Sequence, residues 1–148
     1  MRPRGGDWLD DEVGAWRRAG IDAVASLLTE EEASDLGLEQ ERELCEAKGI
    51  RFHSLPIVDR GVPASHADTL AFLRGLDAAL NRGANVAVHC RQGIGRSGLI
   101  AVGLLVENGL TPEAAVRRTS DARGIAIPET EEQRGWIDRL AATLAGKN

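Results

Sequence analysis

The sequence has no tyrosine, two cysteines, three histidines and no continuous apolar run of the length that crosses a bilayer. Two cysteines outside any Cys-x-x-Cys spacing cannot build a disulfide framework, and with so few histidines they do not form a zinc site. Residues 1–6 lack the apolar segment of a secretory leader. We therefore expect a soluble, cytoplasmic protein that does not associate with membranes and binds neither a metal nor another cofactor.

Charge is unevenly distributed along the 148 residues, whose net charge is −5. Residues 1–50 carry 6 Lys and Arg against 13 Asp and Glu, whereas residues 51–148 carry 12 against 10. The slightly cationic second part can steer an anionic ligand, but it has no basic stripe of the kind that nucleic-acid-binding domains present. We therefore expect no nucleic-acid partner, and we expect a monomer.

The apolar pattern alternates between short and long segments. Three short segments have the length and composition of buried strands: 21–28, 50–55 and 85–89. Longer segments carry apolar residues at helical spacing: 7–18, 39–48, 65–82, 97–108, 111–122 and 130–144. This alternation predicts one α/β domain over residues 1–148, with residues 1–6 flexible. Its central sheet should be mostly parallel, with about four or five strands and helices on both faces.

Two local patterns near the start of the chain allow specific predictions. Trp8 and Trp16 belong to an apolar set at helical spacing, so we expect both side chains in the core. Thr29 and Glu32 have the spacing of a capping box, which predicts a helix start. The acidic run at 30–32 could also bind a cation, but a capped and solvated helix start explains it better.

A ten-residue segment, HCRQGIGRSG at positions 89–98, organises the chain. It lies between a predicted strand and an apolar helix, and its three glycines allow the backbone to approach a ligand closely. The N–H groups at the start of the helix make such a loop an anion-binding site. Cys90 at its beginning should be a thiolate near neutral pH, with a pKa of roughly 3.5–7.5. Arg96 can bind two oxygens of a phosphate with its planar guanidinium.

Other interpretations of this loop are weaker. Gly93-x-Gly95-x-x-Gly98 also matches the dinucleotide fingerprint, but the following residues predict helix, and Arg117 and Arg118 occupy the place of the ribose-binding acid. A nucleotide-triphosphate loop would need a glycine at position 90 and a lysine at position 96. A glycine-rich turn with a buried cysteine would leave the flanking strand, helix and arginine unexplained.

The segment resembles the His-Cys-x-x-Gly-x-Gly-Arg-Ser/Thr-Gly motif of the cysteine-dependent protein tyrosine phosphatase superfamily, in particular its small single-domain, atypical dual-specificity members. The resemblance extends to 55–59 (LPIVD) and to 127–133 (IPETEEQ), so it covers most of the chain. It implies a phosphatase-like fold and a hydrolase that forms a cysteinyl-phosphate.

The resemblance also implies roles for individual residues. Cys90 would be the nucleophile, Asp59 the general acid and later the base, and Ser97 a hydroxyl that helps the thiolate leave. The phosphate would be bound by Arg91, Gln92, Gly93, Ile94, Gly95 and Arg96. Ser97 is equally explained as the N-cap of the central helix.

Several residues have more than one interpretation. Gln133 resembles a glutamine that positions the hydrolytic water, although a capping box with Thr130 explains it equally well. Arg123 resembles a phosphate-contacting arginine, but the spacing differs. Cys45 could form a disulfide with oxidised Cys90, yet packing in the core is a better explanation. His89 points to the opposite side of its strand from Cys90, so it cannot easily act as the base for Cys90. The resemblance instead implies a structural role, in which His89 tunes the thiolate through the loop backbone.

The predicted function is therefore hydrolysis of phosphoproteins, with phosphotyrosine preferred and phosphoserine or phosphothreonine also accepted. Alternatives are a phosphatase of a phosphoinositide or nucleotide, and a phosphate-binding module without turnover. Superfamily members that act on lipids carry lysines inside the loop, where this chain has Gln92 and Ile94. The lack of tyrosine removes the residue that lines a deep phosphotyrosine pocket in many relatives, so the depth of the pocket stays open.

Overall fold

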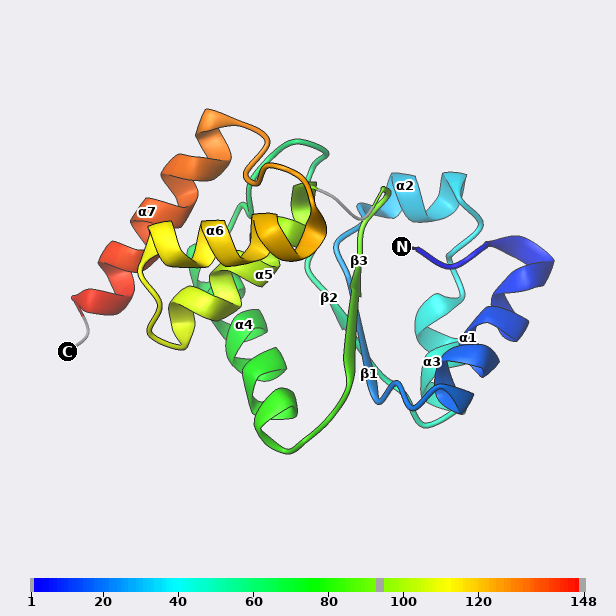
Figure 1. Ribbon diagram of the computed structural model, residues 1–148. Helices are drawn as coiled ribbons and strands as arrows, with labels where there is room; N and C mark the ends of the chain where they lie inside the picture. Colours follow the sequence, from blue (N-terminus) through cyan, green and yellow to red (C-terminus); the bar gives the residue numbers. More distant parts are fainter. Residues whose placement is uncertain (1, 93–94, 147–148) are drawn as a thin grey trace.

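A parallel sheet separates the helices into two groups in the computed structural model, which describes residues 2–92 and 95–146 (Figure 1). The strands are β1 (Ala23–Ser26), β2 (Arg51–Ser54) and β3 (Val86–His89), in the order β2-β1-β3. In the register of the sheet, Ala25 lies between His53 and Val88. The predicted α/β fold with a parallel sheet is confirmed, and its three strands lie within the three predicted segments.

The number of strands is smaller than expected, because the described residues form three strands where about four or five were predicted. The described chain after His89 is helical or irregular, because its apolar residues recur at helical and not at alternating spacing. Hydrogen bonding continues past the end of β2, where the N–H groups of Leu55 and Ile57 donate to the carbonyls of Ser26 and Leu27 at 3.0 and 3.1 Å. This extension directs the chain to the carboxyl edge of the sheet, where Asp59 follows.

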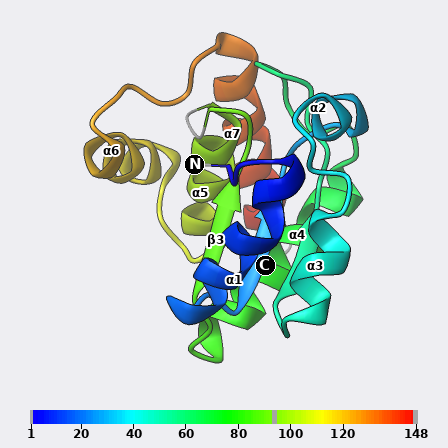
Figure 2. The ribbon, with the colours of Figure 1, turned by 90° about the vertical axis from the view of Figure 1, so that its right-hand side faces the viewer.

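Helices cover both faces of the sheet, as predicted. One face carries α4 (His66–Asn81), α5 (Gly95–Glu107), α6 (Pro112–Arg123) and α7 (Glu131–Ala145). The other carries α1 (Leu9–Arg18), α2 (Glu30–Asp35) and α3 (Glu41–Ala47), and Figure 2 looks onto this face. Each face has its own hydrophobic cluster, one built around Leu73, Leu99 and Ile137 and the other around Val13, Val24 and Ile50.

The prediction for Trp8 is wrong. Trp8 lies in a 3-10 turn (Gly6–Trp8) that precedes α1, and 56% of the residue is exposed. Its ring lies 4.3 Å from the Arg4 guanidinium, an arrangement that suits a solvated aromatic side chain. Trp16 is half-buried against the cluster around Val13. Helical spacing identified the right side of the helix but not the residue at which the helix begins.

Cys45 lies fully buried in the same cluster, and no disulfide joins it to Cys90. Burial, together with the nearby carboxylates of Glu41 and Glu46, raises the pKa of Cys45 to about 12. The thiol is therefore protonated and inert at neutral pH. The expected packing role is confirmed.

Residues 2–6 contact the body of the protein. The Gly6 N–H donates to the carbonyl of Gly37 at 2.9 Å, and Arg2 donates to the carbonyl of Arg91 at 2.7 Å. A Cβ at Gly5 would overlap the carbonyl of Leu36, so only glycine allows this close approach. Over the described ranges, no helix has the length and apolar character needed to span a membrane.

Candidate active site

Cys90 directly follows β3 and precedes α5, so it lies at the carboxyl edge of the sheet. The residue is 2% exposed, and Ser97 Oγ donates a hydrogen bond to its sulfur at 3.2 Å. Ser97 is itself buried in the first turn of α5. A donor aimed at the sulfur, beside a helix N-terminus, favours negative charge on that atom. The structure thus brings Cys90 and Ser97 together, while Gly93 and Ile94 lie outside the described residues.

Arg96 is buried and held by three hydrogen bonds. Nη1 and Nη2 donate to the two carboxylate oxygens of Glu32 at 2.6 and 2.9 Å, and Nη1 also donates to the carbonyl of Ile57 at 2.8 Å. Burial is the largest influence on the pKa of Arg96 and lowers it, but hydrogen bonds and charge attraction, mainly from Glu32, outweigh burial and raise the pKa overall. The guanidinium is therefore charged and fixed in direction.

Glu32 has two roles, of which the sequence predicted one. The capping box is confirmed, because the Glu32 N–H donates to Thr29 Oγ1 and the Thr29 N–H donates to Glu32 Oε1. The same carboxylate binds Arg96, and this hydrogen bonding is the main reason that the pKa of Glu32 is lowered. We did not predict the second role, because Glu32 and Arg96 are 64 positions apart and the capping box already explained the glutamate.

Asp59 lies on an exposed turn beside Arg96. The turn spans residues 58–61 and is closed by a hydrogen bond of 2.7 Å from the Gly61 N–H to the carbonyl of Val58. Arg60 adopts a φ of 62°, an unusual value for a side-chain-bearing residue. The Asp59 side chain is 69% exposed, and its Oδ1 lies 3.7 Å from Arg96 Nη2.

These residues surround a cleft of about 120 Å³ at the carboxyl edge of the sheet. Its described lining consists of Asp59, Arg60, Cys90, Arg91, Gln92, Gly95, Arg96 and Glu129. All the described residues that we predicted in the phosphate-binding loop, from Arg91 to Arg96, therefore reach the cleft. A nucleophilic sulfur, a buried cation and an exposed carboxylate around a small volume can bind a phosphate and exchange a proton with it.

Glu129 is a second carboxylate of the cleft that we did not predict. Its Oε2 lies 3.8 Å from Arg60 Nη1 on the Asp59 turn. A Cβ at Gly95 would overlap its carboxylate, so the glutamate lies directly against the start of α5. The segment 127–133 indicated that this region is important, but it did not show which side chain faces the cleft.

The structure places Gln133 behind the cleft. It is fully buried, and it is not among the residues that line the cleft. Its Nε2 donates to the carbonyl of Gly61 at 3.1 Å, and its Oε1 accepts from the Glu129 N–H at 3.0 Å. Its backbone N–H donates to Thr130 Oγ1, so Thr130 caps α7 as predicted. The Gln133 side chain does not complete the predicted capping box, because its amide binds Gly61 and Glu129 instead.

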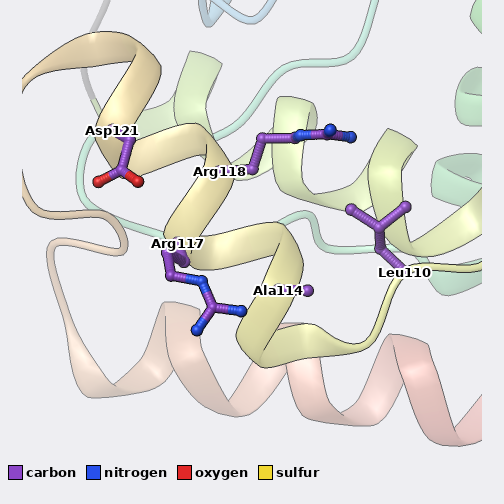
Figure 3. Close-up of a pocket in the computed structure, with 5 residues that line it drawn as sticks. All are labelled: Leu110, Ala114, Arg117, Arg118 and Asp121. Carbon is purple, nitrogen blue, oxygen red and sulfur yellow. The ribbon is translucent and has the colours of Figure 1, made fainter.

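None of the remaining candidates lines the cleft. His89 Nε2 and Glu41 Oε2 are 2.6 Å apart, and both side chains are buried on the α3 side of the sheet. Arg123 is exposed at the end of α6 and does not line the cleft. A separate hollow on α6 contains Arg117 and Arg118, but Figure 3 shows their guanidinium groups pointing in different directions, so they do not converge on one anion.

The described side chains of the cleft are not grouped as metal ligands. Among the residues that the structure describes, no group of three or more His, Cys, Asp or Glu side chains is arranged to hold a metal ion. Two carboxylates in and beside the cleft pair with arginines, since Glu32 pairs with Arg96 and Glu129 lies near Arg60.

Comparisons with known proteins point to one family. The family described as "Polymorphic toxin system, DSP-PTPase phosphatase" matches residues 1–110. Human cyclin-dependent kinase inhibitor 3 is 29% identical over 138 residues, which are 89% of this chain and 65% of the human protein. The chain thus spans slightly less than two thirds of that relative's length.

Solved structures agree with this match. The structure of kinase-associated phosphatase with a serine in place of its catalytic-site cysteine has a TM-score of 0.82 and 25% identity, and the match covers 92% of this chain and 77% of that chain. The active form of Tk-PTP has a TM-score of 0.75 and 29% identity, with 90% and 84% covered.

Proposed function

This chain belongs to the DSP-PTPase phosphatase family, and we propose that it hydrolyses phosphomonoesters on proteins through a cysteinyl-phosphate intermediate. The observation that carries the proposal is the meeting of Cys90, Ser97 and Arg96 at the start of α5. Ser97 directs its hydroxyl at the sulfur, and Arg96 presents a buried cation beside the same cleft. These groups supply a nucleophile, a donor to the sulfur and a cation for the phosphate.

The first step forms the intermediate. The Cys90 thiolate attacks phosphorus while the bond from phosphorus to the leaving oxygen breaks, and Asp59 donates its proton to that oxygen. Among the described residues, Glu32 and Ile57 occupy three of the five N–H donors of Arg96, which leaves Nε–H and one N–H on Nη2 for phosphate oxygens. The loop N–H groups around Gln92 and Gly95 complete the binding of the equatorial oxygens.

The second step releases inorganic phosphate. Asp59, now ionised, removes a proton from water while the water oxygen attacks phosphorus and the phosphorus–sulfur bond breaks. The electron pair of that bond returns to Cys90 as a thiolate. The Ser97 hydroxyl stabilises this charge, since its Oγ lies 3.2 Å from the sulfur. Both catalytic groups thereby return to their starting protonation states.

We propose phosphotyrosine as the preferred substrate, with phosphoserine and phosphothreonine also accepted. Phenols have a pKa of about 10, so a tyrosine oxygen leaves more easily than the alkoxide of serine. The described lining of the cleft contains no aromatic residue that would demand a planar ring, and this allows a smaller phosphorylated side chain to reach Cys90. It contains arginines and no lysine, which gives little support to a phosphoinositide substrate.

The test is a panel of phosphotyrosyl and phosphoseryl peptides, an inositol lipid and a nucleotide, assayed at one pH with wild type and Cys90→Ser. We expect the wild type to turn over the peptides fastest, and the variant to bind them without turnover. Activity of Cys90→Ser near that of the wild type would refute the mechanism. Faster turnover of the lipid or nucleotide would replace the proposed substrate, and binding without turnover by the wild type would indicate a binding module.

A further inference from the structure

Gln133 connects two segments of the cleft wall through its side-chain amide. The nitrogen donates to the carbonyl of Gly61 and the oxygen accepts from the N–H of Glu129, at 3.1 and 3.0 Å. The side chain is fully buried, so water does not replace either partner. Each end of the amide is thus satisfied by the backbone of a different segment.

Both segments reach the cleft. Gly61 closes the turn that presents Asp59, and Glu129 lies 3.8 Å from Arg60 on the same turn. The other end of the turn is fixed separately, because Arg96 donates to the carbonyl of Ile57 at 2.8 Å. Asp59 therefore lies between two anchored carbonyl groups, one held by Arg96 and the other by Gln133.

We propose that Gln133 is a positioning residue for the general acid, which holds the Gly61 carbonyl and thereby fixes the direction of the Asp59 carboxylate. The inference rests on the proposed function, because it takes Asp59 as the proton donor. Proton transfer needs the donor within about 2.6–3.2 Å of the leaving oxygen, and a displacement of about 1 Å can lower a rate by about 10². Release of Gly61 frees one end of a turn that is only four residues long.

Two substitutions remove the link and leave the helix cap in place, because the cap uses the backbone N–H of Gln133. Gln133→Met keeps the size of the side chain and removes both hydrogen bonds. Gln133→Glu keeps an acceptor for the Glu129 N–H and, while the new carboxyl is ionised, turns an oxygen toward the carbonyl of Gly61, which breaks the contact with the turn. Asn85→Ala serves as a matched control, because it removes an amide-to-carbonyl hydrogen bond to Gly20 near the opposite edge of the sheet.

The experiment measures kcat/KM for aryl phosphates whose leaving groups differ in pKa. For each variant, we compare kcat/KM for a poor leaving group with kcat/KM for a good one. The ratio of these two values does not depend on the fraction of folded protein. We expect both Gln133 variants to lose about 10- to 100-fold on phenyl phosphate and less than about threefold on nitrophenyl phosphate. In an Asp59→Asn background, the same substitutions should change the ratio by less than about twofold, since the two residues act as one unit.

The proposal would be overturned if the Gln133 variants lost the same factor in kcat/KM for every leaving group. It would also be overturned if the substitutions changed the ratio of kcat/KM values as much in the Asp59→Asn background as in the wild type. An initial burst of leaving group in the Gln133 variants would instead assign Gln133 to the hydrolysis of the intermediate. An unchanged ratio of kcat/KM values, equal to that of the wild type, would leave Gln133 no role at the site. These failures are distinguishable from failure of the proposed function, in which Cys90→Ser would itself stay active.

Discussion

The hydrogen-bonded pair of Glu32 and Arg96 allows the sharpest test of how the cleft is built. We choose Glu32→Gln because the amide keeps the size of the side chain and one acceptor oxygen. It removes the negative charge and one of the two hydrogen bonds to Arg96, at 2.6 and 2.9 Å. The Arg96 side chain is 2% exposed, so water does not replace the lost partner.

The structure sets the size of the expected effect. A hydrogen bond between charged groups contributes about 1.5–3 kcal/mol to the free energy of unfolding. For a domain of this size, we expect the melting temperature to fall by about 3–12 °C. A misdirected Arg96 should also lower kcat/KM by about 10- to 100-fold, even on an activated aryl phosphate. Calorimetry and initial rates at pH 7 measure the two effects.

The pH dependence gives an independent check. Arg96 holds the pKa of Glu32 below its ordinary value of 4.5. A carboxyl with a lowered pKa in the folded state stabilises the fold fully above its unfolded pKa, and this contribution is lost as the pH falls through the folded pKa. The difference in melting temperature between wild type and Glu32→Gln should therefore be largest near pH 7 and shrink below pH 4.5.

Glu30→Gln is the matched control, since Glu30 lies in the same first turn of α2, is exposed and forms no ion pair with any residue in the described part of the chain. It should match the wild type in both assays. Equal melting temperatures for wild type and Glu32→Gln at pH 7, or a difference that stays constant down to pH 3, would refute the reasoning.

Two further substitutions test the start of α5. Ser97→Ala removes the donor to the leaving sulfur, so it should lower kcat by about 10- to 100-fold. Rapid-mixing experiments should then show an initial burst of leaving group. Equal losses in kcat and kcat/KM without a burst would contradict this role. Gly98→Ala places a Cβ 2.5 Å from Ile127 Cδ1 in the core and should cost about 1–3 kcal/mol of unfolding free energy in a thermal melt. Gly103→Ala, whose nearest contacts are 3.4 Å, should be neutral, and equal stability of the two variants would contradict the packing argument.

The parts of the site that were predictable from the sequence are those whose residues lie close together in the chain. Cys90, Arg96 and Ser97 fall within eight positions between a strand and a helix, so one local pattern brings them together. Helix caps at Thr29 and Thr130 are also local, and the structure confirms both. In each case the spacing alone determines which atoms can meet.

Contacts between distant segments were not predictable in the same way. Glu129 reaches the cleft and Glu32 reaches Arg96 only because separate connections end at the same edge of the sheet, and a lone glutamate carries no signal of that. For Glu32 the capping box was a correct prediction, but it did not reveal the contact with Arg96. For Trp8 the local pattern gave a wrong prediction. Its spacing fitted the buried face of a helix, whereas the chain before Leu9 forms a 3-10 turn.

The two carboxylates beside Arg96 differ in how tightly they bind the guanidinium and in how exposed their side chains are. Glu32 binds both terminal nitrogens at 2.6 and 2.9 Å, whereas the Asp59 oxygen lies 3.7 Å away on a side chain that is 69% exposed. An arriving phosphate dianion can therefore take the place of Asp59 beside Arg96 without turning the guanidinium. In the proposed mechanism Asp59 is then free to face the leaving oxygen, while Glu32 keeps the Arg96 guanidinium in place. A site with two equally tight carboxylates would have to break a buried ion pair in every turnover, which would cost several kcal/mol.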